Sequence, residues 1–360
     1  MAVKNYGGEF WNERVRGLAP YTPGEQPRNR RYVKLNTNEN PYPPSPLVIE
    51  AIKQAADDRL RLYPDPECWE LRESIAERFG VQPEQVFAGN GSDEILAFAF
   101  GAFFSDKVLF PDVTYSFYPV YAKLWGVPFE CPPLNDDFSI NPDDYTRGRL
   151  HAGVVFPNPN APTGRSMEVS TILSIAAARK DRVVIVDEAY AAFAQENLSV
   201  ASYAAADANL LTVHTLSKFA SLAGLRVGFA IGNESLIEGL RRMRDSFNSY
   251  TLDRLAQAGA IAVMKDRAYD EGVTRKVIDT RERVSAALSS MGFEVIPSDA
   301  NFVFIRHPAQ KGADFFAYLR EKSILTRHFN NPPRITDFLR VSIGTDSDMD
   351  MFLEACQESR

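Results

Sequence analysis

The chain has 360 residues, of which 45% are hydrophobic, and its 47 acidic side chains outnumber the 40 lysines and arginines, giving a formal net charge of -7. This length allows a large buried core and predicts one large domain with a smaller one, or two of intermediate size. The acidic balance excludes a general attraction to nucleic acid or to an anionic membrane, so any phosphate or carboxylate ligand must be held by local groups.

The three cysteines, Cys68, Cys131 and Cys356, are far apart and lack the spacing of metal ligands. This set favours a reducing compartment and argues against a disulfide framework or a metal site. The N-terminus has no apolar stretch typical of a signal peptide, and the most apolar run, 95–104, is too short to cross a bilayer. We therefore expect a soluble, cytoplasmic protein with neither a nucleic-acid nor a membrane partner.

The N-terminal part of the chain is predicted to be irregular as far as Ser45. The polar, proline-rich segment before that residue cannot form a helix interior and predicts a loop or arm. Ser45 is expected to cap a helix, and a second helix is predicted over about 67–79. The side chains of this second helix that we expect to face inward are Trp69, Ile75 and Phe79.

From residue 86 onward, short apolar strands alternate with helices such as 169–179 and 234–247. A strand at 86–88 leads into the glycine-rich turn Gly89–Glu94, which opens a helix. Further strands are predicted at 108–110, 127–129, 154–156, 183–186, 210–213 and 227–231. Several of these runs are apolar without interruption, which is typical of strands buried on both faces of a mostly parallel sheet.

The last third of the chain predicts a second, smaller α+β unit. Two long helical patterns follow Asp253 and end at Gly292. Strands with helices between them are then expected at 293–296, 301–306, 324–329 and 338–343. We assign residues 40–260 to a large domain, and residues 1–39 together with 261–360 to a small domain.

Polar residues that directly follow apolar strands are the first candidates for a site, because ligands of open α/β sheets gather beyond the carboxyl ends of the strands. Lys218 lies in such a place, where desolvation would lower the pKa of its amine and favour Schiff-base chemistry; a surface lysine with a packed stem is the alternative. Asp187 would either cap a helix or pair with a buried cation such as a pyridinium nitrogen. Tyr190 can offer its phenol to the same ligand or belong to the core.

The turn Gly89–Glu94 is similar to a dinucleotide fingerprint, but Glu94 replaces the third glycine and no acidic ribose partner is evident at the right distance. Such a turn at a helix start suits a single phosphate better. Tyr115 can stack on a planar ring or belong to the core. The expected phosphate donors are the backbone N–H groups of Gly91, Ser92 and Asp93, the hydroxyls of Thr215 and Ser217, and the guanidinium of Arg226.

An amine, a carboxylate for a ring nitrogen, a phenol, an aromatic platform and a phosphate cradle together describe a site for pyridoxal 5′-phosphate. The chain resembles the fold type I, aspartate-aminotransferase-like enzymes and, among them, the histidinol-phosphate aminotransferases. The resemblance covers nearly the whole length and rests on the order and spacing of its motifs. These motifs are Leu35-Asn-Thr-Asn-Glu-Asn-Pro, Gly89-Asn-Gly-Ser-Asp-Glu, Asn158-Pro-Asn-Ala-Pro-Thr-Gly, Val186-Asp-Glu-Ala-Tyr, Thr215-Leu-Ser-Lys with Arg226 eight residues beyond the lysine, and Phe338-Leu-Arg-Val-Ser-Ile-Gly.

The resemblance implies a large domain with a mostly parallel, mixed sheet between helices, and a smaller α+β domain. It implies that Lys218 forms the covalent link to the cofactor, that Asp187 keeps the ring nitrogen protonated and that Tyr190 meets the 3′-oxygen. Tyr115 would stack on the ring. Tyr63 would reach the phosphate of a neighbouring subunit, which makes the active unit a homodimer with shared sites. The residues implied around the phosphate are Gly91, Ser92, Asp93, Ser217 and Arg226.

One position departs from the family pattern. The family usually has asparagine directly before Pro-Thr-Gly, where it bonds to the 3′-oxygen, and this chain has Ala161. We expect Asn160, one residue earlier, to take that role.

The resemblance also implies the substrates, histidinol phosphate with 2-oxoglutarate or glutamate. Arg340 resembles the anion-binding arginine of the family and Arg327 the arginine used for the substrate phosphate, with Tyr21 close by; surface ion pairs are the alternative for both arginines. Asn38 and Asn301 are further candidates for the same pocket.

Two other functions remain open from the sequence. An aromatic or broad-range aminotransferase, or a threonine-phosphate decarboxylase, would have the same fold and similar arginines. A non-catalytic regulator that binds pyridoxal phosphate would need a helix-turn-helix or a basic face, and the sequence indicates neither.

Overall fold

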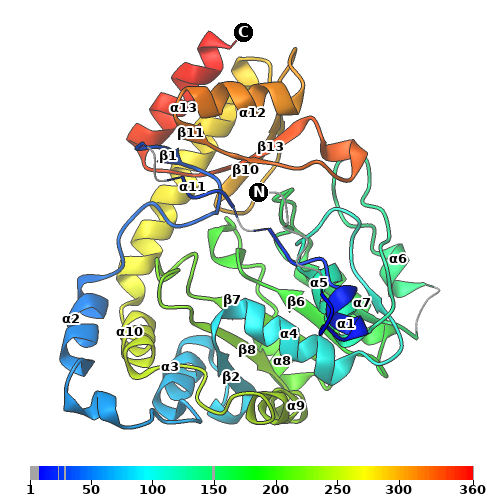
Figure 1. Ribbon diagram of the computed structural model, residues 1–360, viewed down its shortest axis with the longest axis vertical. Coiled ribbons are helices and arrows are strands. Elements are labelled where there is room, and N and C mark those ends of the chain that lie inside the picture. Colours follow the sequence, from blue (N-terminus) through cyan, green and yellow to red (C-terminus); the bar gives the residue numbers. More distant parts are fainter. Residues whose placement is uncertain (1–7, 23, 28–29, 148–150, 360) are drawn as a thin grey trace.

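The computed structural model describes residues 8–22, 24–27, 30–147 and 151–359 (Figure 1). Its larger unit is built around a seven-stranded sheet with the order β2-β8-β7-β6-β5-β3-β4. The strands are β2 (Val86–Gly89), β3 (Val108–Leu109), β4 (Phe129–Glu130), β5 (Gly153–Pro157), β6 (Val184–Asp187), β7 (Leu210–Thr215) and β8 (Gly228–Gly232). Strand β8 runs opposite to the other six strands of this sheet, so the sheet is mixed and mostly parallel, as predicted.

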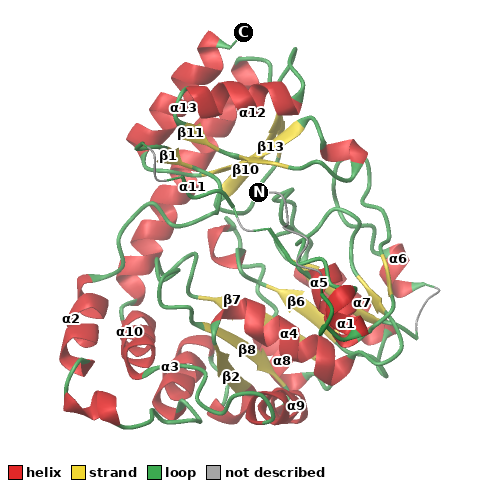
Figure 2. Cartoon of the chain, in the orientation of Figure 1, coloured by secondary structure: helices red, strands yellow, loops and turns green. Residues whose placement is uncertain are grey.

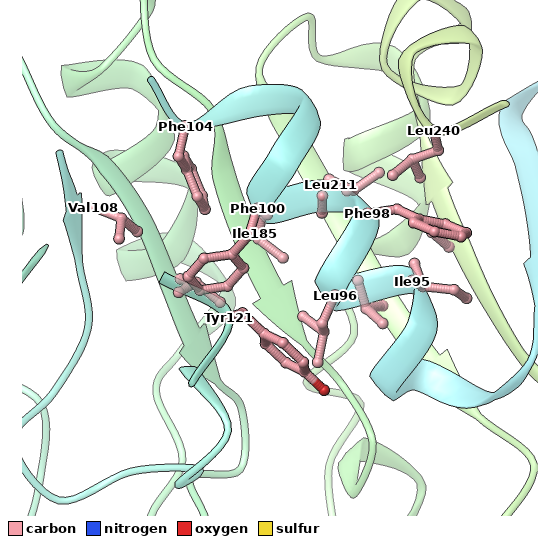
Figure 3. Close-up of a cluster of buried hydrophobic side chains, with 14 of the residues drawn as sticks. Ile95, Leu96, Phe98, Phe100, Phe104, Val108, Tyr121, Ile185, Leu211 and Leu240 are labelled. Atoms are coloured by element: carbon pink, nitrogen blue, oxygen red, sulfur yellow. The ribbon is translucent and has the colours of Figure 1, made fainter. Parts of the chain in front are cut away.

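Helices cover both faces of this sheet (Figure 2). One face carries α4 (Gly91–Phe103), α5 (Tyr118–Trp125) and α9 (Glu234–Asp245). Their apolar side chains close over the strands around Ile185 and Leu211 (Figure 3). The other face carries α3 (Trp69–Phe79), α7 (Val169–Ala178), α8 (Ala201–Ala206) and α10 (Arg254–Lys265). Coverage on both sides explains why the central strands are apolar without alternation.

The smaller unit contains a four-stranded antiparallel sheet with the order β12-β13-β10-β9. Its strands are β9 (Glu294–Ile296), β10 (Phe302–Arg306), β12 (Arg327–His328) and β13 (Phe338–Ser342). A separate parallel pair, β1 (Val33–Lys34) with β11 (Ile324–Leu325), attaches the N-terminal arm to this unit. The helices of this unit are α11 (Arg267–Ser290), α12 (Gly312–Glu321) and α13 (Asp346–Glu358). The predicted boundaries, 40–260 against 1–39 with 261–360, stay a prediction.

The remaining elements are short or lie at the edge of the larger unit. Helix α2 (Pro46–Ala55) packs beside α10, and its first turn is capped by Ser45, whose side chain accepts from the backbone N–H of Leu47. The others are α1 (Glu13–Arg16), α6 (Asp143–Thr146) and the 3-10 turns η1 (Asp58–Arg61), η2 (Pro83–Gln85), η3 (Ala191–Phe193) and η4 (Pro333–Ile335). The cap predicted at Ser45 is thus confirmed.

Two expectations about local structure were wrong. Trp69 does not face inward: it is 41% exposed in the first turn of α3, where its Nε1 donates to Glu73, while Ile75 is buried. The strand expected at 324–329 is divided at Thr326 into β11 and β12, which belong to different sheets. A continuous β-like sequence cannot reveal such a change of sheet, because both halves have the same local pattern.

Across the described residues, no helix combines the length and the apolar character needed to cross a membrane. The same residues contain no group of three or more histidine, cysteine or acidic side chains arranged to hold a metal ion.

Candidate active site

A cavity of about 540 Å³ lies at the carboxyl ends of β5, β6 and β7 and is lined on its far side by Arg327 of β12, Arg340 of β13 and the N-terminal arm. This volume is in the range of small-molecule sites. The cavity brings together most of the residues that the sequence predicted. These are Tyr21, Asn38, Ser92, Asp93, Tyr115, Asp187, Tyr190, Thr215, Ser217, Lys218, Arg226, Arg327 and Arg340.

Lys218 follows β7 and extends its amine into the cavity, where Nζ donates to the carbonyl oxygen of Thr37 at 3.0 Å. Burial, together with the nearby positive charge of Arg340, lowers the pKa of the amine to about 8. Roughly a tenth of this amine is therefore neutral at pH 7, far more than for a lysine of ordinary pKa. A neutral amine has a free lone pair and can act as a nucleophile or as a base.

Asp187 ends β6 and is 4% exposed. Its carboxylate accepts from the backbone N–H of Ala189 and from the hydroxyl of Tyr118, both at 3.2 Å. Burial nevertheless raises the pKa of the carboxyl to about 7. A cationic ring nitrogen placed against this carboxyl would favour its ionised form and would itself stay protonated.

Tyr118 is a site residue that the sequence did not indicate. It lies fully buried on α5, three positions after Tyr115, and looks like an ordinary core residue in the sequence. Tyr115 lies before the start of α5, so no helical spacing links the two tyrosines and the sequence carries no local signal for Tyr118.

A glycine turn and an arginine form the end of the cavity that suits a phosphate. Gly91 opens α4 with φ +77°, and a side chain there would come within 2.7 Å of Nη2 of Arg226. Arg226 is held by Asp93, whose Oδ2 accepts from Nη2 at 3.1 Å, and by the hydroxyl of Ser217 at 3.3 Å. The side chain of Thr215 accepts from the backbone of Ser217. The helix start and the guanidinium thus present donors to one point.

Tyr115 is tied to the same network. Its hydroxyl donates to Oδ1 of Asp93 at 2.6 Å, and the hydroxyl of Tyr121 approaches the same oxygen at 3.4 Å. Because Asp93 also binds Arg226, one carboxylate fixes both the aromatic wall of the cavity and the cation of its phosphate end.

Two arginines form the opposite end. Arg327 and Arg340 are direct cross-strand partners in the β12–β13 pair, and both line the cavity. Nη2 of Arg340 donates to the carbonyl of Asn36 at 3.1 Å, and Nη2 of Arg327 to that of Thr22 at 3.4 Å. Like charges opposite each other are unfavourable unless an anion lies between them, so this pair is suited to an anionic substrate group. Tyr21 stacks on Phe117 beside it, with ring centroids 4.3 Å apart.

Asn160 does not lie in the cavity, which corrects the expectation that it replaces the missing asparagine. It is fully buried, and its amide donates to Val113 and Thr163 and accepts from Thr114. Ala161 lines the cavity instead. The family position is therefore occupied by a methyl group, and the 3′-oxygen has to find its donors elsewhere.

Two further predicted residues also lie outside the cavity. Asn301 is absent from the cavity lining, and its Nδ2 donates to the backbone carbonyl of Asn38. Tyr63 is 77% exposed and stacks on Tyr250 at 4.5 Å, so in a single chain it cannot reach the site.

Comparison with known proteins decides the family. Residues 30–356 match the family of class I and II aminotransferases. The chain belongs to this family. The expected family is therefore confirmed.

Individual relatives agree with this assignment. The histidinol-phosphate aminotransferase of Clostridium acetobutylicum is 54% identical over 352 residues, which cover 97% of this chain and 99% of that protein. The one of Aromatoleum aromaticum is 53% identical over 354 residues, with coverage of 97% and 99%. Among solved structures, the histidinol-phosphate aminotransferase of Sinorhizobium meliloti in complex with pyridoxal 5′-phosphate superposes with a TM-score of 0.83 at 25% identity, over 91% of each chain. The predicted fold type is also confirmed.

Steric space at Gly228 provides a test of the phosphate end. A Cβ at this position would lie 2.5 Å from the backbone of Gly91 and Ser92, which cannot move without distorting the start of α4. We expect Gly228→Ala to lower the free energy of unfolding by about 1–3 kcal/mol and to weaken pyridoxal phosphate binding roughly tenfold or more. Equilibrium denaturation and cofactor titration measure the two effects.

Gly224→Ala is the matched control, because a Cβ there meets nothing within 4 Å. It should bind the cofactor like the wild type. Equal binding by both variants would show that the approach of β8 to α4 does not shape the phosphate end.

The raised pKa of Asp187 makes a second prediction. In the unfolded chain this carboxyl ionises near its usual pKa of 3.8, whereas in the fold its pKa is about 7. The folded state therefore binds the extra proton, and the stability linked to this group is complete below about pH 4 and lost as the pH rises to about 7. The substitution Asp187→Asn should remove this pH-dependent loss of stability, because an amide does not ionise.

We expect the cofactor-free Asp187→Asn protein to be more stable than the wild type at pH 8, by on the order of a few kcal/mol, and nearly equal at pH 4. Its turnover with the cofactor should fall at least roughly a hundredfold. Thermal unfolding at both pH values measures the first effect. A variant that is destabilised at pH 8 would contradict this account of the carboxyl.

Proposed function

We propose that this aminotransferase uses pyridoxal 5′-phosphate to transfer the amino group between histidinol phosphate and 2-oxoglutarate. The main support is one cavity that holds a buried amine and carboxyl at one end and the opposed Arg327 and Arg340 at the other. Relatives with 54% and 53% identity that carry the name histidinol-phosphate aminotransferase support the choice of substrate.

The residues present fit the cofactor. The space kept open by Gly91, the helix start at Ser92 and the guanidinium of Arg226 suit its phosphate, and Tyr115 offers a flat wall for the ring. Asp187 would face the ring nitrogen. When bound, pyridoxal phosphate supplies an electron sink that stabilises negative charge on the substrate carbon.

Lys218 is the residue that binds the cofactor and moves the proton in this proposal. With its pKa near 8, the amine can be neutral when it accepts a proton from the substrate carbon, and Nζ would then deliver that proton to C4′ of the cofactor. Asp187 favours the protonated ring nitrogen through its negative charge, which the bonds from Ala189 and Tyr118 help to maintain.

The arginine pair would hold the anionic end of either substrate. A guanidinium can bind a carboxylate or a phosphate through two parallel hydrogen bonds, so the same pair suits both 2-oxoglutarate and a phosphorylated amino alcohol. Burial of Arg340 strengthens such a contact, because fewer waters compete for it.

We expect kcat/KM for histidinol phosphate to exceed that for unphosphorylated histidinol by roughly a hundredfold or more, and Arg327→Gln to reduce this ratio at least about tenfold. Arg306→Gln is the control, since Arg306 pairs with Glu294 on the same sheet and does not line the cavity.

The same assay distinguishes the other functions. A preference for phenylalanine would indicate an aromatic aminotransferase, and release of carbon dioxide from threonine phosphate would indicate the decarboxylase. A cofactor that is converted to its amino form by none of these amines would indicate a regulator.

We further propose that the active unit is a homodimer. Exposed apolar side chains gather on α2, η1, α3 and the loop before α10, and a patch of this kind marks an interaction surface. A second copy would cover the patch and bring Tyr63 of the partner subunit to the phosphate. The side chains concerned are Leu47, Ile49, Leu60, Leu62, Tyr63, Trp69, Phe247 and Tyr250. The proposed location is the cytoplasm, because the free thiols of Cys68, Cys131 and Cys356 suit a reducing compartment.

Hybrid dimers test the shared site. Lys218→Ala and Tyr63→Phe homodimers should both be impaired, because every site in each carries the lesion. A mixture of refolded subunits should recover up to about a quarter of wild-type activity, because each hybrid has one site with both residues intact. If mixing gives no recovery, Tyr63 does not act across subunits.

A further inference from the structure

The amide of Asn38 lies between the two parts of the active site. This residue is 1% exposed and sits in the arm with φ +56°, a left-handed conformation that asparagine tolerates better than most side chains. Its Nδ2 donates to the hydroxyl oxygen of Tyr190 at 3.0 Å. Its Oδ1 accepts from the hydroxyl of Ser342, and its backbone N–H donates to the same hydroxyl, both at 2.8 Å.

These contacts fix which way the amide points. If the amide were turned over, Nδ2 and the backbone N–H would both donate to Ser342, whose own proton would then need another acceptor. None lies within hydrogen-bond distance among the described residues, and Ser342 is buried. A buried hydroxyl proton without an acceptor is strongly unfavourable, so Nδ2 must face Tyr190.

The orientation of the amide decides where the proton of Tyr190 goes. A tyrosine hydroxyl has one proton, and its oxygen already accepts from Asn38. The described part of the chain offers that proton no acceptor, and Tyr190 lines the cavity. The phenol is therefore a donor toward the cavity, where the family resemblance implies the 3′-oxygen of the cofactor.

We infer that Asn38 is a positioning residue that holds Tyr190 as a hydrogen-bond donor to the 3′-oxygen, and not a substrate ligand. The inference rests on the proposed function. The donor role of Tyr190 matters more in this chain because Ala161 replaces the usual second donor, so the 3′-oxygen depends on the phenol. The expectation that Asn38 binds substrate does not fit this geometry, since both polar atoms of its amide are engaged.

The same contacts join this donor to the substrate end. Ser342 lies on β13 two residues after Arg340, and Asn301 donates to the backbone carbonyl of Asn38 at 3.0 Å. The strand that carries the anion-binding arginine therefore also holds the amide that directs the phenol. A shift of β13 would change both contacts together.

The test is the pH at which the visible absorption of the bound cofactor changes. A donor to the 3′-oxygen stabilises its anionic form, so loss of the donor raises this pH. We expect Tyr190→Phe to raise it by about one to two units. Asn38→Asp should also raise it, because a carboxylate can only accept and takes the proton of Tyr190. Asn38→Gly should raise it by less than Tyr190→Phe does, because glycine tolerates the left-handed backbone and leaves the phenol proton free but no longer holds the phenol in place.

A double variant separates this role from the added charge of the aspartate. If Asn38 acts through Tyr190, Asn38→Asp should add little to the shift already caused by Tyr190→Phe. An equal shift in both backgrounds, or no shift in Asn38→Asp alone, would overturn the inference. Asn301→Ala is the structural control: it removes a bond to the Asn38 backbone and should lower the melting temperature without moving the absorption change.

Failure of the proposed function has a different signature, because histidinol phosphate would then leave the bound cofactor unconverted to its amino form at whatever pH the absorption change occurs. If Tyr190→Phe leaves the absorption change at the wild-type pH, the phenol does not meet the 3′-oxygen and the inference falls with that contact. If only the Asn38 variants fail to respond, the contact stands and the inference alone is wrong.

Discussion

Removal of charged groups from water at the carboxyl edge of one sheet is the constraint on which this site depends. Asp187 ends β6 and Lys218 follows the adjacent strand β7, and burial moves the pKa of the amine down to about 8 and that of the carboxyl up to about 7. The pKa of each group thus lies near neutral pH before a ligand binds, so that the charge of a bound ligand can decide its protonation. The cost is stability, because both groups would be more favourably charged in water. A large core on both faces of the sheet makes that cost tolerable.

Around these two groups, the remaining polar residues are held by one another before any ligand binds. Asp93 joins Arg226 to Tyr115, and Asn38 joins Tyr190 to Ser342. Such pairs reduce the number of side-chain conformations that a ligand has to select, which favours binding and precise placement of the reacting groups. The opposed arginines are the exception, since their mutual repulsion is relieved only by an anion.

The sequence was most informative where one local rule decides the structure. Uninterrupted apolar runs predicted the buried strands, and a polar residue directly after such a run predicted Asp187 and Lys218. It was least informative where a residue resembles core but acts through a distant contact. Tyr118 looks like any buried aromatic, and its partner Asp187 is 69 positions away. The prediction for Asn160 was wrong for a related reason: moving by one residue along a turn points the side chain away from the cavity.

Asn38 shows most clearly what cannot be predicted from the sequence alone. Its motif suggested a place in the pocket, but its role depends on the direction of two hydrogen bonds to residues 152 and 304 positions away. The direction of these hydrogen bonds follows from which groups can donate and which can accept at Ser342 and Tyr190, and these partners are known only from the folded structure. Because Ser342 and Arg340 share β13, the strand that would bind the substrate anion also sets the donor at the cofactor. In the proposed function, substrate binding and cofactor polarisation are therefore connected through the amide of Asn38, in addition to the reaction between the two ligands.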